Sequence, residues 1–271
     1  MKQPIGVIDS GVGGLTVASE LVRQLPKESI IYVGDTKRCP YGPRPREEVV
    51  QYTWEMVQFL LARDIKMLVV ACNTATAFTL EQLREQLTIP VVGVIQPGAR
   101  AAITHSRTGE IGVIGTEGTI SSKAYVNALQ HINTEIDVFD LACPQFVSIV
   151  EQGLVQGEKA YQVVYESLQP LKRHVNMDTL ILGCTHYPMI RELIQEVMGP
   201  MVMVISSGEE TAREVSTILG YQKKLYQGSA PSRHHFYTTG DVQVFENIAS
   251  RWLNKRIEAV DQIELNTVKN M

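Results

Sequence analysis

The sequence predicts an α/β protein of two pseudo-symmetric domains, each with a mostly parallel sheet flanked by helices. Three observations support this fold class. Short apolar runs rich in β-branched residues alternate with longer helical stretches, the runs are apolar almost without interruption, and three sequence markers occur twice in the same order. Near-continuous apolarity is typical of strands that are buried on both faces, as in parallel sheets covered by helices.

The predicted strands are apolar runs that are too short for helices. They lie at residues 5–8, 30–33, 67–71, 91–94, 111–114, 136–139, 179–182 and 201–205. Helical stretches separate them at residues 15–25, 46–63, 80–87, 146–150 and 189–198. Strands that alternate with helices form parallel sheets, whose ligand sites lie beyond the carboxyl ends of the strands.

The three repeated markers divide most of the chain into two similar halves. The pairs are residues 5–16 with 111–122, Cys39-Pro40 with Cys143-Pro144, and residues 68–75 with 180–187. In the first pair, each member reads as a strand, a loop rich in glycine and hydroxyl groups, and the start of a helix. The repeat therefore predicts two homologous α/β units, with chance similarity between two generic strand-loop-helix units as the alternative.

The segment from about residue 206 onward has no counterpart in the repeat. It contains predicted helices at residues 209–219 and 242–253 and a predicted strand at residues 235–239. We expect it to pack on the first unit. The predicted domains are therefore residues 1–95 plus 206–271 and residues 96–205, with a turn at Gln96-Pro97-Gly98 as the hinge.

The composition restricts the class of protein. The chain has 271 residues, 44% hydrophobic and 20% charged, with a formal net charge of -4. This charge gives no electrostatic reason to expect direct binding of nucleic acid or of an anionic membrane. No segment reaches the apolar length of a membrane span, and residues 5–8 are too short for the core of a signal peptide. We therefore expect a cytoplasmic protein with no membrane partner.

The cysteines differ in their sequence context. The four of them, Cys39, Cys72, Cys143 and Cys184, are too far apart for the close pairs of zinc or redox motifs, and a reducing compartment disfavours disulfides. No metal site is predicted. Only Cys72 and Cys184 directly follow an apolar strand and precede hydroxyl-bearing residues. Cys39 and Cys143 lack this context and are interpreted as structural.

Cys72 follows a predicted buried strand and precedes Asn73 and Thr74. The threonines that come next are candidate caps for a helix N-terminus. A helix N-terminus favours negative charge, so a cysteine there is a candidate thiolate and the neighbouring amides are candidate anion donors.

Cys184 repeats this arrangement and adds a histidine. The run Gly183-Cys184-Thr185-His186 ends a predicted strand and leads to a proline near the next helix. His186 is a candidate proton-transfer partner for Cys184. A purely structural histidine is an equally open alternative on sequence alone.

Other polar residues surround these positions. The loop Asp9-Ser10-Gly-Val-Gly-Gly14 lacks the Gly-Lys-Ser/Thr of a phosphate-binding loop. Asp9 would repel a phosphate but attract an ammonium group, so Asp9 and Ser10 suit a small zwitterion; helix capping is the alternative. Tyr41-Gly42 lies in a proline-rich, stiff loop whose amides are candidate donors. Glu151 is a candidate supporting acid, although a solvated helix carboxylate is the simpler interpretation.

Two cysteines at equivalent strand ends of facing halves predict an active site in the cleft between the domains. One thiolate can remove a proton from one face of a carbon while the opposed thiol returns a proton to the other face. This is stereoinversion. A cysteine nucleophile would instead need one cysteine, a base and an oxyanion hole, and no duplicated cysteine.

At these residues the sequence closely resembles bacterial glutamate racemases of the aspartate/glutamate racemase superfamily. The matching motifs are residues 8–15, Gly34-Asp35, Pro40-Tyr41-Gly42, residues 71–75, Gly115-Thr116 with Thr119, and residues 183–188 and 236–241. They span most of the chain.

The resemblance implies interconversion of L- and D-glutamate with no cofactor and no metal, supplying D-glutamate for peptidoglycan, by an enzyme that is commonly a homodimer. It implies that Cys72 removes the α-proton of D-glutamate and Cys184 that of L-glutamate. Asp9 would support Cys72, His186 would support Cys184, and Asp35 and Glu151 would assist. The implied substrate-binding residues are Asp9, Ser10, Tyr41, Gly42, Asn73, Thr74, Thr116, Thr119 and Thr185.

Three other functions stay open at the level of sequence. The nearest is a racemase of aspartate or another amino acid. A second is a hydrolase with Cys184 as nucleophile and His186 as base, which would leave Cys72 without a role. The third is an amino-acid-binding regulator without catalysis.

Overall fold

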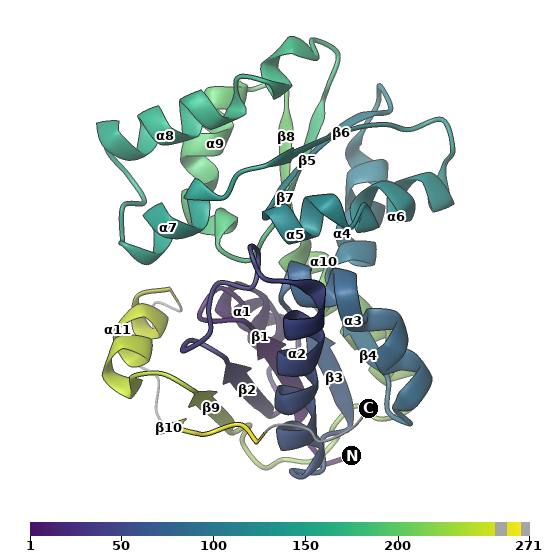
Figure 1. Cartoon of the computed structure of the whole chain (residues 1–271). Coiled ribbons are helices and arrows are strands. Elements are labelled where there is room, and N and C mark those ends of the chain that lie inside the picture. The colour runs from purple at the N-terminus through teal and green to yellow at the C-terminus, as the bar shows by residue number, and fades with distance from the viewer. Residues whose placement is uncertain (253–258, 267–271) are drawn as a thin grey trace.

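The computed structural model, drawn in Figure 1, describes residues 1–252 and 259–266, and its strands form two sheets. We call the part built on the larger sheet the first half and the part built on the smaller sheet the second half. The first sheet contains β1 (Ile5–Asp9), β2 (Ile30–Gly34), β3 (Met67–Val70), β4 (Val91–Gly93), β9 (His234–Thr238) and β10 (Val260–Gln262). The second contains β5 (Glu110–Gly115), β6 (Asp137–Ala142), β7 (Thr179–Gly183) and β8 (Met203–Ser206).

The strand order confirms the pseudo-symmetry predicted from the repeat. The first sheet has the order β10-β9-β2-β1-β3-β4 and the second β6-β5-β7-β8, with every described pair parallel. β2-β1-β3-β4 thus corresponds to β6-β5-β7-β8. In each half the first strand along the chain lies between the next two, and this is the point where parallel sheets form ligand sites.

Helices cover both faces of each sheet (Figure 1). The first half has α1 (Leu15–Gln24), α2 (Arg46–Leu61), α3 (Asn73–Gln86), α10 (Ser207–Tyr221) and α11 (Val242–Trp252). The second has α4 (Ile95–His105), α5 (Glu117–Ser121), α6 (Ala124–Ile132), α7 (Gln145–Glu151), α8 (Glu158–Leu168) and α9 (Arg191–Met198), with 3₁₀ turns η1 (Leu171–Arg173) and η2 (Tyr187–Ile190). Helix α10 contacts both α1 and α4, and so lies against both halves.

The strands are apolar throughout because successive side chains enter different cores. Along β3, Met67 and Val69 join a core with α1 and α10, while Leu68 and Val70 join a core with α2 and α3. Side chains alternate between the two faces of a strand, so a strand covered on both faces must be apolar at every position. This confirms the interpretation of the short apolar runs as doubly buried strands.

The predicted hinge turn at Gln96-Pro97-Gly98 is wrong. These residues form the first turn of α4. Proline is tolerated in a first helical turn, where its missing N–H would have no helical partner, so it did not end the helix here. Gly98 is fully helical, and its amide donates to the carbonyl of Val94 at 3.2 Å.

Several element boundaries also differ from those predicted. The helix predicted at residues 80–87 begins directly after Cys72, because the threonines thought to precede it lie inside it. The helix predicted at 189–198 begins as the 3₁₀ turn η2. The helix predicted at 242–253 is described to Trp252, and residue 253 lies outside the described residues. The domain bounds at 95/96 and 205/206 stay a prediction.

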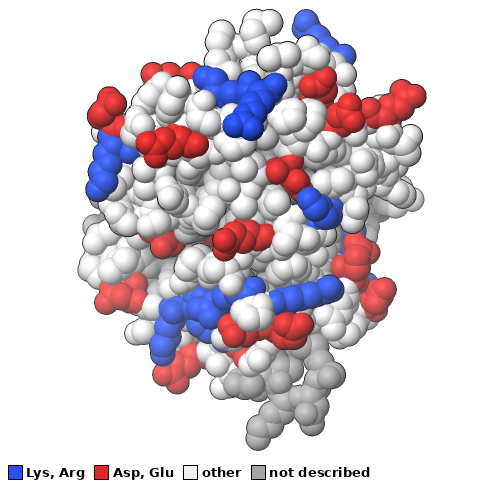
Figure 2. All heavy atoms as spheres, turned by 45° about the horizontal axis from the view of Figure 1, so that its top comes forward, with Lys and Arg blue, Asp and Glu red and all other residues white. Residues whose placement is uncertain are grey.

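The described residues include no helix that is both long and apolar enough to span a membrane. On the face drawn in Figure 2, Lys and Arg side chains lie beside Asp and Glu side chains in several small groups.

Candidate active site

A small pocket lies where the strand ends of the two halves meet. The loops after β1 and β3 reach it from the first half, and the loops after β5 and β7 reach it from the second. Both Cys72 and Cys184 line it, which agrees with the predicted cleft. The lining is Ser10, Pro40, Tyr41, Gly42, Cys72, Asn73, Thr74, Thr116, Val147, Gly183, Cys184, Thr185 and His186.

Most of the predicted site residues are in this lining. The other four predicted residues, Asp9, Asp35, Thr119 and Glu151, each hydrogen-bond to a residue that lines the pocket. A larger hollow of about 900 Å³ lies between α2, α3, α4 and α6, but it is lined by none of the predicted site residues. The clustered thiols and titratable groups therefore direct attention to the smaller pocket.

Cys72 is the N-cap residue of α3. Its Sγ accepts a hydrogen bond from the amide of Ala75 at 3.5 Å and donates to Ser10 Oγ at 3.7 Å. Burial and the nearby charge of Asp9 together raise the pKa of the Cys72 thiol to about 12, although the hydrogen bond from the Ala75 amide opposes this shift. With the pocket in this arrangement, Cys72 holds its proton at neutral pH.

Asp9 ends β1 and is fully buried. Its Oδ2 accepts from the amide of Gly11 at 2.9 Å, and its Oδ1 accepts from the hydroxyl of Thr185 at 3.3 Å. Burial raises the pKa of Asp9, although the charge of His186 opposes that shift. Asp9 therefore joins the first half to the loop that carries Cys184.

Cys184, His186 and Glu151 form a chain of contacts. Cys184 Sγ lies 3.9 Å from His186 Nδ1, and His186 Nε2 lies 3.2 Å from Glu151 Oε1. Burial alone would lower the pKa of His186, but its hydrogen bonds to Cys184 and Glu151 outweigh burial and raise it to about 10. The same bond from His186 lowers the pKa of Glu151. An imidazolium with an acceptor at each nitrogen therefore faces the Cys184 sulfur at neutral pH.

Three threonine hydroxyls meet across the two halves. Thr74 Oγ1 lies 2.8 Å from Thr116 Oγ1 and 3.1 Å from Thr119 Oγ1, and the latter two are 3.1 Å apart. Thr74 is in the first turn of α3, and Thr116 is the N-cap of α5. Hydroxyl donors and two helix N-termini together form a site suited to a carboxylate.

Asn73 presents a free donor. Its Oδ1 accepts from Tyr125 Oη at 2.7 Å, whereas its Nδ2 is buried without a hydrogen-bond partner in the described part of the chain. Leaving a buried amide hydrogen unpaired costs free energy, so such a group indicates a place for a bound acceptor.

Asp35 holds a loop in place. It accepts from Tyr41 Oη at 2.5 Å, from Arg38 Nε at 2.6 Å and from Thr239 Oγ1 at 2.8 Å. These bonds fix the loop that carries Tyr41 and Gly42 at the pocket. The structure thus places Asp35 behind Tyr41, where it positions the loop.

Several residues of this region were missed from the sequence. Gly13 lies so close to the Cys184 loop that a Cβ there would be 2.3 Å from Thr185 Oγ1 and 2.7 Å from His186 Nδ1. Trp252 of α11 lies edge-on to His186, with ring centroids 6.1 Å apart. Tyr125 and Arg38 were also missed. Only the glycine-rich loop carried a local signal, because the other contacts join residues distant in sequence.

The two cysteines interpreted as structural differ. Cys143 is buried in the core of the second half, as expected. Cys39 lies beside the site, because its Sγ donates to Glu151 Oε1 at 3.2 Å. The structural interpretation of Cys39 missed this contact, which crosses between the halves.

Comparisons with known proteins find relatives that cover most of the chain. The model of the family Asp/Glu/Hydantoin racemase matches residues 5–215. A protein of Oceanobacillus iheyensis named glutamate racemase is 63% identical over 249 residues, which are 92% of this chain and 91% of the relative. One of Bacillus cereus with the same name is 59% identical over 265 residues, or 98% of each chain.

Solved structures are similar over nearly the whole length. A glutamate racemase isoform from Bacillus anthracis superposes with a TM-score of 0.95 at 53% identity, over 98% of this chain and 99% of the other. A glutamate racemase from Francisella tularensis, solved in complex with D-glutamate, has a TM-score of 0.92 at 33% identity over the same shares. An aspartate racemase from Picrophilus torridus has a TM-score of 0.55 at 20% identity, over 80% of this chain and 94% of the other, so that likeness concerns the fold alone.

Proposed function

The chain belongs to the Asp/Glu/Hydantoin racemase family, among its glutamate racemases, and from this we propose that it interconverts L- and D-glutamate through Cys72 and Cys184. The observation that carries the mechanism is the placement of both cysteines in one pocket. They come from equivalent strand ends of two pseudo-symmetric halves, and both are more than nine-tenths buried.

The proposed reaction moves one proton off the α-carbon and another onto it. The thiolate of Cys72 takes the α-proton of D-glutamate, and the thiol of Cys184 delivers its proton to the opposite face. In the other direction Cys184 takes the α-proton of L-glutamate, and Cys72 delivers. The free enzyme returns with the proton on the other sulfur, so the protons balance over one turnover.

The supporting groups differ between the two sulfurs. The His186 imidazolium 3.9 Å from Cys184 stabilises a thiolate there by its charge, and Glu151 orients the ring. Cys72 has the amide of Ala75, and Asp9 lies close enough to raise its pKa. We propose that the resting enzyme keeps a proton on Cys72.

The difficult step is removal of a weakly acidic α-proton, because charge develops on the substrate carboxylate. The hydroxyls of Thr74, Thr116 and Thr119 and the unpaired Nδ2 of Asn73 are donors that can stabilise this charge. Donors that are fixed before reaction in a pocket without bulk water are worth most. Ser10, Tyr41, Gly42 and Thr185 complete the proposed substrate contacts, and Asp9 suits the ammonium group.

Substrate entry requires movement. The space in the pocket is about 10 Å³, roughly room for one water molecule. Glutamate therefore cannot enter unless the halves move apart. We propose domains of residues 1–95 plus 206–271 and residues 96–205, with opening at the two chain segments that join them.

The wider role follows from the family. We propose that the enzyme works in the cytoplasm as a homodimer, without metal or organic cofactor, and supplies D-glutamate for peptidoglycan. D-glutamate as a ligand of the Francisella tularensis enzyme supports glutamate as the substrate. Use of aspartate instead is an outcome that the following test can return.

The test combines optical activity and hydrogen exchange. Purified protein is mixed with L-glutamate in D2O with no added cofactor, and circular dichroism and the proton NMR signal of the α-carbon are followed. Loss of optical activity with deuterium entering the α-position is the expected result. Activity with aspartate alone would show that aspartate is the substrate. No loss of optical activity and no deuterium exchange with either amino acid would overturn the proposal.

A further inference from the structure

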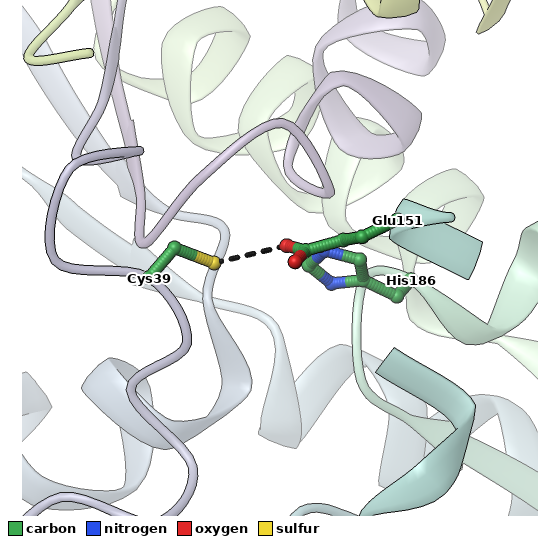
Figure 3. A group of neighbouring side chains, drawn as sticks. All are labelled: Cys39, Glu151 and His186. Atoms are coloured by element: carbon green, nitrogen blue, oxygen red, sulfur yellow. Dashed lines mark hydrogen bonds and ion pairs between the residues drawn. The ribbon is translucent and has the colours of Figure 1, made fainter. Parts of the chain in front are cut away.

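We propose that Cys39, Glu151 and His186 form a three-ligand site for a thiophilic divalent cation such as Zn²⁺, and that an ion bound there inhibits the enzyme. The inhibition rests on the proposed function, whereas the binding does not. Figure 3 shows Cys39 reaching from one side toward the Glu151 carboxylate, which lies against the His186 ring.

The ligand atoms are near the separations that a metal needs. Cys39 Sγ and His186 Nε2 each lie 3.2 Å from Glu151 Oε1, and the ligand atoms of all three residues lie within 4.8 Å of one another. Metal–ligand bonds of about 2.0–2.3 Å in a tetrahedron place ligands roughly 3.4–3.6 Å apart. The two 3.2 Å distances from Glu151 Oε1 must therefore lengthen slightly. The distance between the ligand atoms of Cys39 and His186, which is within 4.8 Å, must shorten by at most about 1.4 Å.

The chemistry of the three groups favours a borderline-soft ion. Thiolate, imidazole and carboxylate together suit Zn²⁺ and Co²⁺, whereas Mg²⁺ and Ca²⁺ prefer oxygen ligands alone. Binding must displace the thiol proton of Cys39 and one proton of the His186 imidazolium, and both go to solvent. Affinity should therefore rise with pH.

An approach route exists through a cavity that the two catalytic cysteines do not line. A cavity of about 300 Å³ has Cys39, Glu151 and Asp241 in its lining. Its two carboxylates attract a cation, and the cavity leaves room for a water as fourth ligand. Cys72 and Cys184 do not line this cavity, so an ion can reach the site without passing between them.

The ligands come from both halves, and this explains the inhibition. Cys39 follows β2 of the first half, while Glu151 ends α7 and His186 follows β7 in the second. An ion held by all three would tie the halves together around a pocket too small for an amino acid. It would also take Glu151 and the Nε2 of His186 away from their support of Cys184.

The first experiment measures binding directly, with Co²⁺ as the probe and the full-length enzyme. A thiolate ligand gives Co²⁺ an intense sulfur-to-metal charge-transfer absorption. We expect this band to saturate at one Co²⁺ per chain, to persist in Cys143→Ser and to disappear in Cys39→Ser. A band that persists in Cys39→Ser but disappears in Cys72→Ser would place the ion between the catalytic cysteines and overturn the proposal, as would no band at all.

The second experiment measures inhibition and stability with Zn²⁺. For each protein, the racemization rate in Zn²⁺ is compared with the rate of the same protein in the presence of a chelator. The Zn²⁺ concentration for half-inhibition should rise at least about tenfold in Cys39→Ser, because removing a ligand or its supporting group typically weakens metal binding by that much. Zn²⁺ should also raise the melting temperature of the unsubstituted enzyme but not that of Cys39→Ser. Equal inhibition of both proteins would contradict the site. A chelated enzyme without racemase activity would refute the proposed function and leave the Co²⁺ result valid.

Discussion

The hydroxyl of Thr185 donates a hydrogen bond to the carboxylate of Asp9 across the two halves, at 3.3 Å. Thr185 directly follows Cys184, and Asp9 is the acid proposed to support Cys72. Thr16 Oγ1 adds a second link by donating to the carbonyl of Thr185, also at 3.3 Å. The environments of the two sulfurs are therefore connected, so a substitution beside one sulfur should alter the surroundings of the other.

Serine at either catalytic position should separate the two half-reactions. We expect Cys72→Ser and Cys184→Ser each to lower the racemization rate by about 10²–10⁴, the usual contribution of a positioned acid or base. Cys72→Ser should still exchange the α-hydrogen of L-glutamate without inversion, and Cys184→Ser that of D-glutamate. Proton NMR in D2O measures the exchange and circular dichroism the inversion. Cys143→Ser is the control, and racemization at the original rate in either catalytic variant would refute the two-cysteine mechanism.

Asn73→Asp should weaken substrate binding. The change keeps an acceptor for Tyr125 Oη but replaces the unpaired Nδ2 donor by a carboxylate oxygen that repels the substrate carboxylate. We expect KM to rise at least about tenfold, since loss of a hydrogen bond to a charged group costs about 1.5–3 kcal/mol. Steady-state kinetics measures this. Tyr125→Phe removes the other bond of Asn73, and an equal rise of KM in that control would show that the loss is one of positioning.

Gly13→Ala should disturb the contact between the halves. A Cβ at this position would meet Thr185 Oγ1 and His186 Nδ1 at distances that real Cβ atoms do not adopt. Overpacking of this kind costs about 1–3 kcal/mol, and we expect a loss of kcat/KM larger than the loss of unfolding free energy explains. Gly208→Ala is the matched control, because its nearest neighbour would be at an ordinary 3.4 Å. Full activity of Gly13→Ala would mean that the halves do not approach this closely during catalysis.

The buried thiol of Cys143 should make the protein sensitive to alkali. Burial raises its pKa from 9.0 to about 12. Above pH 9 the unfolded chain releases this proton while the folded protein keeps it. The stabilisation is therefore complete below pH 9 and is lost as the pH rises toward 12.

Urea unfolding between pH 9 and 12 tests this sign. The free energy of unfolding should fall more steeply with pH in the unsubstituted protein than in Cys143→Ala. The difference in slope should be at most about 1.4 kcal/mol per pH unit, the value for one proton. Parallel curves for the two proteins would contradict it. The pKa of Cys72 is also raised, but Cys72 is present in both proteins, so it does not affect the comparison.

Local sequence patterns predicted the strands and the strand-end cysteines well. The run from Met67 to Val70 is apolar at every position because both faces are covered, and the apolarity stops where Cys72 begins the next helix. The same patterns failed at Gln96 to Gly98, where proline and glycine resemble a turn. Those residues are helical because α4 packs against α6 and α10, a contact that neighbouring residues in the sequence do not reveal.

The sequence by itself determined the alternation of strands and helices, the duplication of the two halves, and the two positions at which a cysteine follows a buried strand. These depend on periodicity and on residues that are close along the chain. Only the tertiary structure decided that Cys39 contacts Glu151, that Tyr125 leaves Asn73 with a free donor, and that His186 carries a raised pKa. The physical reason is that burial and charge–charge contacts act through space, between residues that folding brings together from distant parts of the chain.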